Sequence, residues 1–423
     1  MLREAGLRRP ATRPTRRCAR RGRGPILART APLGATPSAP ADVPPGRLPL
    51  IDATRGVAAQ LIVLHHLAWY GPLGDTVRPL APALIDWLTY DARRAVQVFL
   101  VLGGFVAALA LAPDAVPVVR RPWVAIGRRW LRLAPAYLVA MLAALAAGVL
   151  ARALLQHESV PATPSAAQVI AHALMLQDVV GTEALTAGAW YVAIDLQLHA
   201  GFVLMLWLFG RLPDPSVSAP VTIVATGLLA VVGLLVWGHD DALEPWALHY
   251  VGLFALGALA WWSGDPRRAP YGVAALAALV LAAVALDWRD RELVGTCTAL
   301  ALAVGRRHGV LSRWPRGRGL ARLGEISYSV FVVHYPVCLV ANACASSLFP
   351  GASWVHLAVM IAAWLASNAA GALLHDRVEV RGRARGPAHA RLSAPARRPP
   401  PAPASASPAS PARSRPPPDA GPD

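Results

Sequence analysis

Long apolar segments alternate with short polar connections from about residue 50 to residue 375. Ten of these segments approach the roughly 20 residues that a helix needs to cross a hydrocarbon layer of about 30 Å. They cover 50–71, 94–112, 133–151, 187–209, 219–238, 246–262, 270–287, 292–305, 325–345 and 353–375. The runs are unbroken and rich in Ala and Leu, whereas a membrane barrel shows segments of about ten residues with alternating polarity. The pattern therefore predicts an all-α, polytopic transmembrane bundle of about ten spans.

The segment 166–180 is shorter and carries Gln168, His172, Gln177 and Asp178. Connections on the cytoplasmic side of a membrane are enriched in basic residues. With ten spans and a cytoplasmic N-terminus, the Arg-bearing connections fall on that side, at 120–132, 211, 267–268 and 306–322. Counting 166–180 as a span would reverse the later connections, so we interpret it as an interfacial or re-entrant helix on the outer side. Both termini are then cytoplasmic.

The composition agrees with a membrane protein, since 55% of the 423 residues are hydrophobic and only 15% are charged. The formal net charge of +17 raises the question of nucleic-acid binding. Residues 1–50 carry 11 Arg against two acids and residues 376–423 carry nine Arg against four, so these ends hold +14 of the charge. Both are rich in Pro, Ala, Ser and Arg, a composition that cannot bury enough apolar area to fold. We expect disordered tails at 1–46 and 376–423 around a membrane domain at 47–375; their charge favours contact with the anionic lipid bilayer, and nucleic acid is not an expected partner.

Ionisable side chains within a span cost roughly 2.5–3.5 kcal/mol each on insertion scales, so each needs a partner or a function. In the first segment, Arg55 and His66 are eleven positions apart, which places them within about 20° on one helical face and about 16 Å apart along it. Asp52 falls on the same face, while His65 points about 100° away. This face predicts either a shared polar cavity, or an interfacial Asp52–Arg55 ion pair with histidines bonded to neighbouring helices.

A second group, Arg129 and Arg132, stands at i and i+3 beside the third apolar segment. This spacing places both guanidinium groups on one helical face, as a clamp for a phosphorylated ligand requires. Arginine at the cytoplasmic end of a span also satisfies the orientation rule without any ligand. Anion binding and plain topology therefore both remain open for this pair.

A third group follows Trp190 in the next apolar segment. Tyr191, Asp195 and His199 have i, i+4, i+8 spacing and form one polar stripe on an otherwise apolar helix. Such a stripe can orient an imidazole or line a hydrated path. Alternatively, Asp195 and His199 satisfy each other.

A fourth group lies in the segment 325–345, where Tyr328 and His334 bring a hydroxyl and an imidazole into an apolar helix. A histidine in such a place is more often a structural hydrogen-bonding group than a catalyst. We keep both interpretations.

These four groups, in this order, resemble the motifs of the acyltransferase-3 family of membrane O-acyltransferases. Ile51–Ala59 is similar to the L-D-x-L-R-G-x-A-A segment that opens the family's first helix, and Arg55 with His66 to its R-x10-H pattern. The other matches are Arg129 and Arg132 to R-x-x-R, Trp190–Gln197 to W-x-L-x-x-E-x-Q, and Ile326–Pro336 to I-S-Y-S-x-x-x-x-H-x-P. The likeness covers roughly residues 47–375 and leaves both tails unmatched.

The resemblance implies transfer of an acyl group, often acetyl, from cytoplasmic acyl-coenzyme A to a hydroxyl of a cell-envelope carbohydrate or glycolipid, in a bacterial cytoplasmic (inner) membrane. Acyl-CoA is then a donor substrate, and no permanently bound cofactor is expected. The candidate catalytic residues are His66, Arg55 and Asp195, and the candidate donor contacts are Arg129 and Arg132. Candidates for substrate binding or structure are Asp52, Trp190, Tyr191, His199, Tyr328 and His334. The four cysteines have neither metal-ligand spacing nor a disulfide framework, and no metal site is predicted.

Two positions depart from the family pattern. Gly103 stands where the family's F-F-x-x-S-G-F motif carries serine, so a hydroxyl is missing. Asp195 replaces the family's glutamate, which keeps the charge on a side chain one methylene shorter. Either change can alter activity or acceptor preference.

Two other function classes fit the same polar groups. A transporter or flippase-like protein would use intramembrane Asp, Arg and His to line a translocation path without changing a bond. A catalytically inactive member would only scaffold an envelope complex. Acylation of a secondary metabolite is a further alternative for the acceptor. Transfer of label from acyl-coenzyme A to a glycan or glycolipid would distinguish an enzyme from both other classes.

Overall fold

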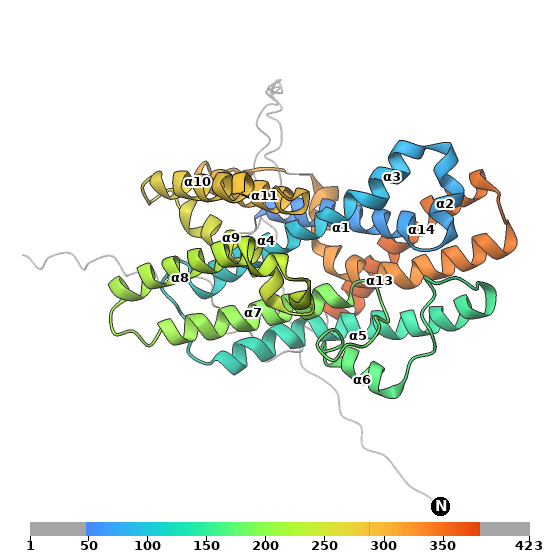
Figure 1. Ribbon diagram of the computed structural model, residues 1–423, viewed down its shortest axis with the longest axis horizontal. Coiled ribbons are helices and arrows are strands. Elements are labelled where there is room, and N and C mark those ends of the chain that lie inside the picture. Colours follow the sequence, from blue (N-terminus) through green and yellow to red (C-terminus); the bar gives the residue numbers. More distant parts are fainter. Residues whose placement is uncertain (1–47, 287, 316, 381–423) are drawn as a thin grey trace, which may run out of the picture. The chain divides into compact units, whose positions relative to one another are not determined.

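The computed structural model describes residues 48–286, 288–315 and 317–380, and within these ranges it contains helices and no β-strand (Figure 1). The helices are α1 (Pro49–Trp69), α2 (Pro72–Val77), α3 (Pro82–Tyr90), α4 (Val96–Leu111), α5 (Pro122–Leu154), α6 (Ala166–Ala173), α7 (Ala189–Phe209), α8 (Pro215–Leu235), α9 (Ala247–Ser263), α10 (Tyr271–Leu286), α11 (Asp290–Arg307), α12 (Val310–Arg313), α13 (Arg318–Leu348) and α14 (Ser353–Leu374). A π-helical turn, His375–Glu379, continues α14. The predicted all-α class is confirmed.

Each of the ten apolar segments coincides with one of the longer helices. Among the described residues, six helices are long and apolar enough to cross a membrane: α4, α5, α7, α8, α13 and α14. The protein is therefore membrane-embedded. That α1, α9, α10 and α11 also cross, giving ten spans, stays a prediction.

Some helices extend beyond the apolar segments that predicted them. Helix α5 begins at Pro122, where the missing N–H of proline costs nothing, so the Arg129/Arg132 pair lies inside this helix. The C-terminal tail was expected to begin at residue 376, but residues 376–380 are helical and Glu379 is buried. Arg322 holds Asp376 at 2.8 Å, which explains the continued order. The remaining parts of both predicted tails lie outside the described residues.

The polar segment after α5 is not a long helix. Only Ala166–Ala173 is helical, and eight residues rise about 12 Å, too little to cross the hydrocarbon layer. Ser165 and Gln168 form a reciprocal capping box at its start. His172 accepts from the backbone N–H of Leu185 at 3.0 Å, which ties α6 to the chain that leads into α7. This agrees with the interpretation that the segment does not span.

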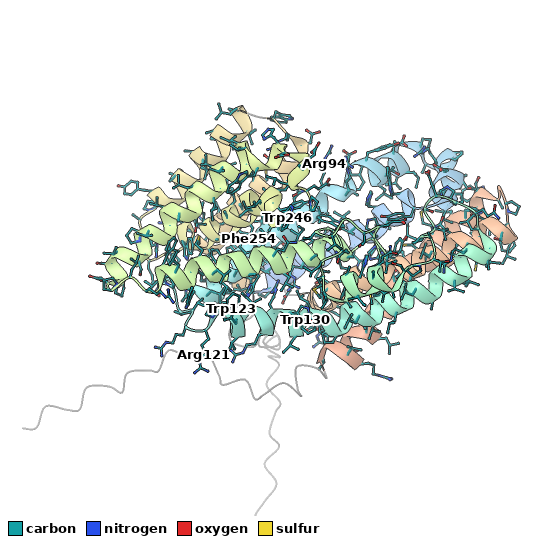
Figure 2. The ribbon with its side chains drawn as sticks, turned by 60° about the horizontal axis from the view of Figure 1, so that its bottom comes forward. Arg94, Arg121, Trp123, Trp130, Trp246 and Phe254 are labelled. Carbon is teal, nitrogen blue, oxygen red and sulfur yellow. The ribbon has the colours of Figure 1, made fainter. Side chains whose placement is uncertain are left out.

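Exposed tryptophans gather at the helix ends. Seven are exposed, each in a terminal turn of a helix or within two residues of one: Trp69, Trp87, Trp123, Trp246, Trp288, Trp314 and Trp354. Tryptophan is enriched where membrane meets water, because its ring is apolar and its N–H is polar. Figure 2 shows Trp123 beside Arg121 at the start of α5. The pattern is that of aromatic belts on an embedded bundle.

The parallel pair α1 and α13 forms one of the two most extensive helix contacts of the described residues, together with α4 and α9. The two backbones cross at Gly56 and Gly324, where a Cβ on Gly56 would lie 2.9 Å from the Gly324 nitrogen. A Cβ on Gly324 would overlap the carbonyl oxygen of Asp52. Small residues of this kind allow close approach of membrane helices. The crossing brings the motif residues of α1 against those of α13.

Replacing Gly324 by alanine tests this crossing. The added methyl group must push α1 from α13, and overpacking of this kind costs about 1–3 kcal/mol. We expect Gly324→Ala to lower the thermal unfolding midpoint of the detergent-solubilised protein. The matched control is Gly319→Ala on the same helix, where a Cβ meets nothing within 4 Å and alanine stabilises the helix by up to about 1 kcal/mol. Equal midpoints for the two variants would contradict the close crossing.

Candidate active site

A cavity of about 110 Å³ lies among α1, α4, α5, α7, α13 and the π-helical turn. Its wall consists of Arg55, Phe99, Leu102, Gly103, Val106, Arg129, Arg132, Leu133, Tyr191, Val192, Asp195, Ser327, Tyr328, Phe331 and Glu379. We call it the arginine cavity. It brings together six of the eleven residues that the sequence singled out: Arg55, Arg129, Arg132, Tyr191, Asp195 and Tyr328.

Arg129 of α5 and Asp195 of α7 form a buried, two-pronged ion pair. Arg129 Nη2 donates to both carboxylate oxygens of Asp195, at 2.6 and 2.7 Å, and its Nε donates to one of them at 3.0 Å. The Asp195 side chain is only 9% exposed. In this geometry each group satisfies the other's charge, because a bidentate Arg–carboxylate pair matches two donors to two acceptors. Arg129 therefore holds Asp195 in place.

Arg55 of α1 lines the same cavity without such a partner. It makes no hydrogen bond or ion pair to any residue in the described part of the chain. Asp52, expected as its ion-pair partner, acts on it only through longer-range electrostatics. A guanidinium in a low-dielectric cavity attracts an anionic or strongly polar group far more than it would in water. Arg55 is thus a cation inside the cavity that is available to a ligand.

The other walls combine exposed and buried groups. Arg132 is exposed as well as cavity-lining, so it can meet a ligand at the entrance. The Tyr328 hydroxyl donates to the backbone carbonyl of Leu133 at 2.8 Å, which joins α13 to α5. Glu379, which sequence reasoning missed, accepts from Ser329 at 3.1 Å and bonds His375 at 2.9 Å. It follows the last apolar segment, where the sequence had been assigned to a tail.

The histidine of the first segment meets the histidine of the late motif. His66 Nδ1 lies 2.6 Å from His334 Nε2, and the rings are stacked with an interplanar angle of 8°. His334 is fully buried, whereas His66 is partly exposed. The two candidates therefore form one unit, and His66 is its accessible member.

The partners of His334 determine which nitrogen carries each proton. Its Nδ1 lies 3.3 Å from the carbonyl oxygen of Val330, which can only accept, so Nδ1 bears the hydrogen. In the neutral ring, Nε2 then accepts, and the hydrogen of the short contact belongs to His66 Nδ1. His66 is left with an unprotonated Nε2. That nitrogen is a base and nucleophile whose orientation is fixed by the second ring.

Aromatic rings surround this histidine pair. Tyr70, one turn after His66 and absent from the sequence-based candidates, has its ring 5.1 Å from His66 and 5.2 Å from Tyr335. Neither His66 nor His334 lines the arginine cavity. Phe331 belongs to both surroundings, since it lines the cavity and lies 6.1 Å from His334.

Two predicted residues lie outside the cavity wall. Trp190 packs against Tyr191 and Tyr250, with ring centroids 6.0 and 5.6 Å apart, and so supports the wall from behind. His199 does not line the cavity and has no hydrogen bond to Asp195 in the described ranges. The alternative in which these two residues satisfy each other is therefore wrong, because Arg129 takes that role.

Packing does not require a glycine at position 103, where the family carries serine. A Cβ there would lie 3.5 Å from the Phe254 ring and 3.8 Å from the Asp195 carboxylate, which is ordinary contact. At the adjacent Gly104, a Cβ would overlap the carbonyl of Phe254. Only the second glycine is needed for the close contact between α4 and α9. Figure 2 shows Phe254 within the helical body.

These neighbouring glycines give a matched pair of substitutions. Gly103→Ser should change the free energy of unfolding by less than about 0.5 kcal/mol, because the side chain has room. Gly104→Ser should cost about 1–3 kcal/mol or more, because α4 and α9 must separate. Thermal unfolding in detergent measures both. A loss at Gly103 as large as that at Gly104 would mean that the space beside Asp195 is not open.

Comparison with known proteins identifies the family. The sequence model of the acyltransferase-3 family, described as an acyltransferase domain, matches residues 48–369. The match covers the described helices α1 to α13 and most of α14, and with them every candidate site residue. Searches of curated proteins and of solved structures gave no significant match. On the family match, which spans most of the chain, this membrane protein belongs to the acyltransferase-3 family.

Proposed function

We propose that the protein transfers an acyl group, in the first instance acetyl, from acyl-CoA to a hydroxyl of a cell-envelope carbohydrate or glycolipid. The proposed location is a bacterial cytoplasmic membrane, with the arginine cavity toward the cytoplasm. Family membership supports acyl transfer in general. The observation that carries the proposal is the His66–His334 pair, which leaves one unprotonated imidazole nitrogen within a membrane domain, near a cavity in which the Arg55 guanidinium has no direct partner among the described residues.

The cavity suits the thioester end of the donor. Its volume of about 110 Å³ is below the roughly 300–1,000 Å³ of a site for a drug-sized ligand, so it takes only the narrow pantetheine arm. The donor phosphates then remain outside, within reach of the exposed Arg132. Arg129 is engaged by Asp195, so we assign it a positioning role and assign the polar contact inside the cavity to Arg55.

The proposed chemistry follows from the orientation of His66. In the direct route, Nε2 removes the proton of the acceptor hydroxyl as the oxygen attacks the thioester carbonyl. The new C–O bond forms, the C–S bond breaks, and the imidazolium returns its proton to the departing thiolate. In the relay route, Nε2 attacks the thioester carbon first, so that a C–N bond forms, the C–S bond breaks and the thiolate leaves. The acceptor hydroxyl then attacks the acyl-imidazole; the C–O bond forms, the C–N bond breaks, and the hydroxyl proton goes to the thiolate. In both routes His334 holds the ring so that Nε2, and not Nδ1, reacts.

Substitution of the two histidines tests these roles. We expect His66→Ala to lower transfer of label from acyl-CoA to glycan or glycolipid by about 10²- to 10⁴-fold, the usual contribution of a general base. His334→Ala should lower kcat less and leave the KM for acyl-CoA unchanged, because it acts through His66. His239→Ala, at an exposed position, is the control. Full activity of His66→Ala in correctly inserted protein would remove the imidazole from the reaction.

The donor contact has its own test. A hydrogen bond to a charged group contributes about 1.5–3 kcal/mol, so Arg55→Gln should raise the KM for acyl-CoA by roughly 10- to 150-fold. Arg128→Gln, at an exposed position beside the ion pair, should leave the KM unchanged. Equal effects of the two changes would assign Arg55 a structural role. If no label transfers from acyl-CoA to any acceptor with the unaltered protein, the transporter interpretation is favoured instead.

A further inference from the structure

Three aromatic rings from three helices meet in the wall of the arginine cavity. Phe99 of α4, Tyr191 of α7 and Phe331 of α13 contact one another, with ring centroids 5.8 Å apart for Phe99–Tyr191, 5.8 Å for Phe99–Phe331 and 5.3 Å for Tyr191–Phe331. All three line the cavity. We call them the ring cluster. Each ring contacts the other two, so the three form one continuous part of the cavity wall.

The histidine pair lies beyond the ring cluster. Along α13, the cavity is lined by Ser327, Tyr328 and Phe331, and His334 follows one turn later. Along α1, the cavity is lined by Arg55, and His66 is eleven residues further, about 16 Å along the helix. Both helices therefore place the histidine beyond the cavity, and on α13 Phe331 of the ring cluster stands between the two. The proposed donor site and the proposed base are on opposite sides of the rings.

Phe331 is the ring that contacts both sides. It belongs to the cluster, and its centroid is also 6.1 Å from that of His334. Its outer edge faces Gly188, where a Cβ would lie 3.0 Å from the Phe331 ring. The backbone of Gly188 has φ −88°, which any residue adopts, so the glycine is not required by the turn. The missing side chain lets the Phe331 ring pack directly against the backbone at Gly188.

We propose that the ring cluster is a closed passage between the arginine cavity and His66, and that Phe331 must move aside for the acyl thioester to reach the imidazole. The inference rests on the proposed acyl transfer. Because the acyl group passes the rings, Phe331 determines how large an acyl group is transferred. The passage also separates the donor from the acceptor side between turnovers, so that thioester is not exposed to water there.

A donor series tests the size limit. Transfer is measured with acetyl-, butyryl- and hexanoyl-CoA for the unaltered protein, Phe331→Ala and the milder Phe331→Leu. We expect the ratio of hexanoyl to acetyl transfer to rise at least tenfold in Phe331→Ala and by less in Phe331→Leu. The control is Phe202→Ala, which removes a buried ring of α7 that packs against Phe254 and Trp262. A ratio that is unchanged in both Phe331 variants, or that rises equally in Phe202→Ala, would overturn the proposal.

A second measurement does not require any activity. Cys18, Cys297, Cys338 and Cys344 are replaced by serine, His66 by cysteine, and a membrane-impermeant thiol reagent is applied from each face in turn. From the face that the arginine cavity opens to, we expect His66→Cys to be labelled only when Phe331→Ala is also present. Labelling from that face at the same rate with Phe331 intact would overturn the closed passage. An unaltered protein that transfers no acyl group, with labelling that still depends on Phe331, would instead refute the proposed function alone.

Discussion

The close crossing of α1 and α13 at Gly56 and Gly324 determines which functional groups meet. The two helices run in parallel, and His66 and His334 each follow the crossing glycine of their helix by ten residues. The same register that puts the two backbones in contact therefore puts the two imidazoles side by side, at 2.6 Å between nitrogens. At the crossing itself, Arg55 directly precedes Gly56 and lines the cavity, as does Tyr328 one turn after Gly324. A side chain at either glycine would separate the helices and with them the two imidazoles.

Two charged groups inside the bundle are balanced by specific partners, whereas Arg55 has no direct partner among the described residues. Arg129 and Asp195 neutralise each other across two helices, and Glu379 is held by Ser329 and His375. Leaving an ionised group unpaired at membrane depth is costly, and such groups mark functional positions. The cavity instead retains Arg55 without a direct partner among the described residues. The cost of that unbalanced cation is understandable if an anionic or polar ligand completes the site.

The sequence predicted the positions of the helices and their polar faces better than the side-chain contacts between helices. Apolar runs located every long helix. The eleven-residue spacing of Arg55 and His66 predicted a polar cavity shared by both residues; Arg55 lines such a cavity, but the sharing is wrong, because His66 lies outside the cavity wall and contacts His334. The Arg129–Asp195 pair joins residues 66 positions apart, and no periodicity within one helix reveals it. It also explains what single-segment reasoning left open, since Asp195 is not satisfied by His199.

Other features were missed because nothing in the sequence around these residues indicates their partners in the fold. Glu379 follows the last apolar run and looked like part of a charged tail, although its partners Ser329 and His375 keep it buried. Phe99 and Phe331 look like ordinary apolar span residues, and only their meeting with Tyr191 makes them a barrier.

The most direct test of the whole account is a structure of the protein with a non-hydrolysable acyl-CoA analogue. The account predicts the thioester carbon next to His66 Nε2, the arm past a displaced Phe331 and the phosphates at Arg132; an analogue bound away from the arginine cavity would contradict it.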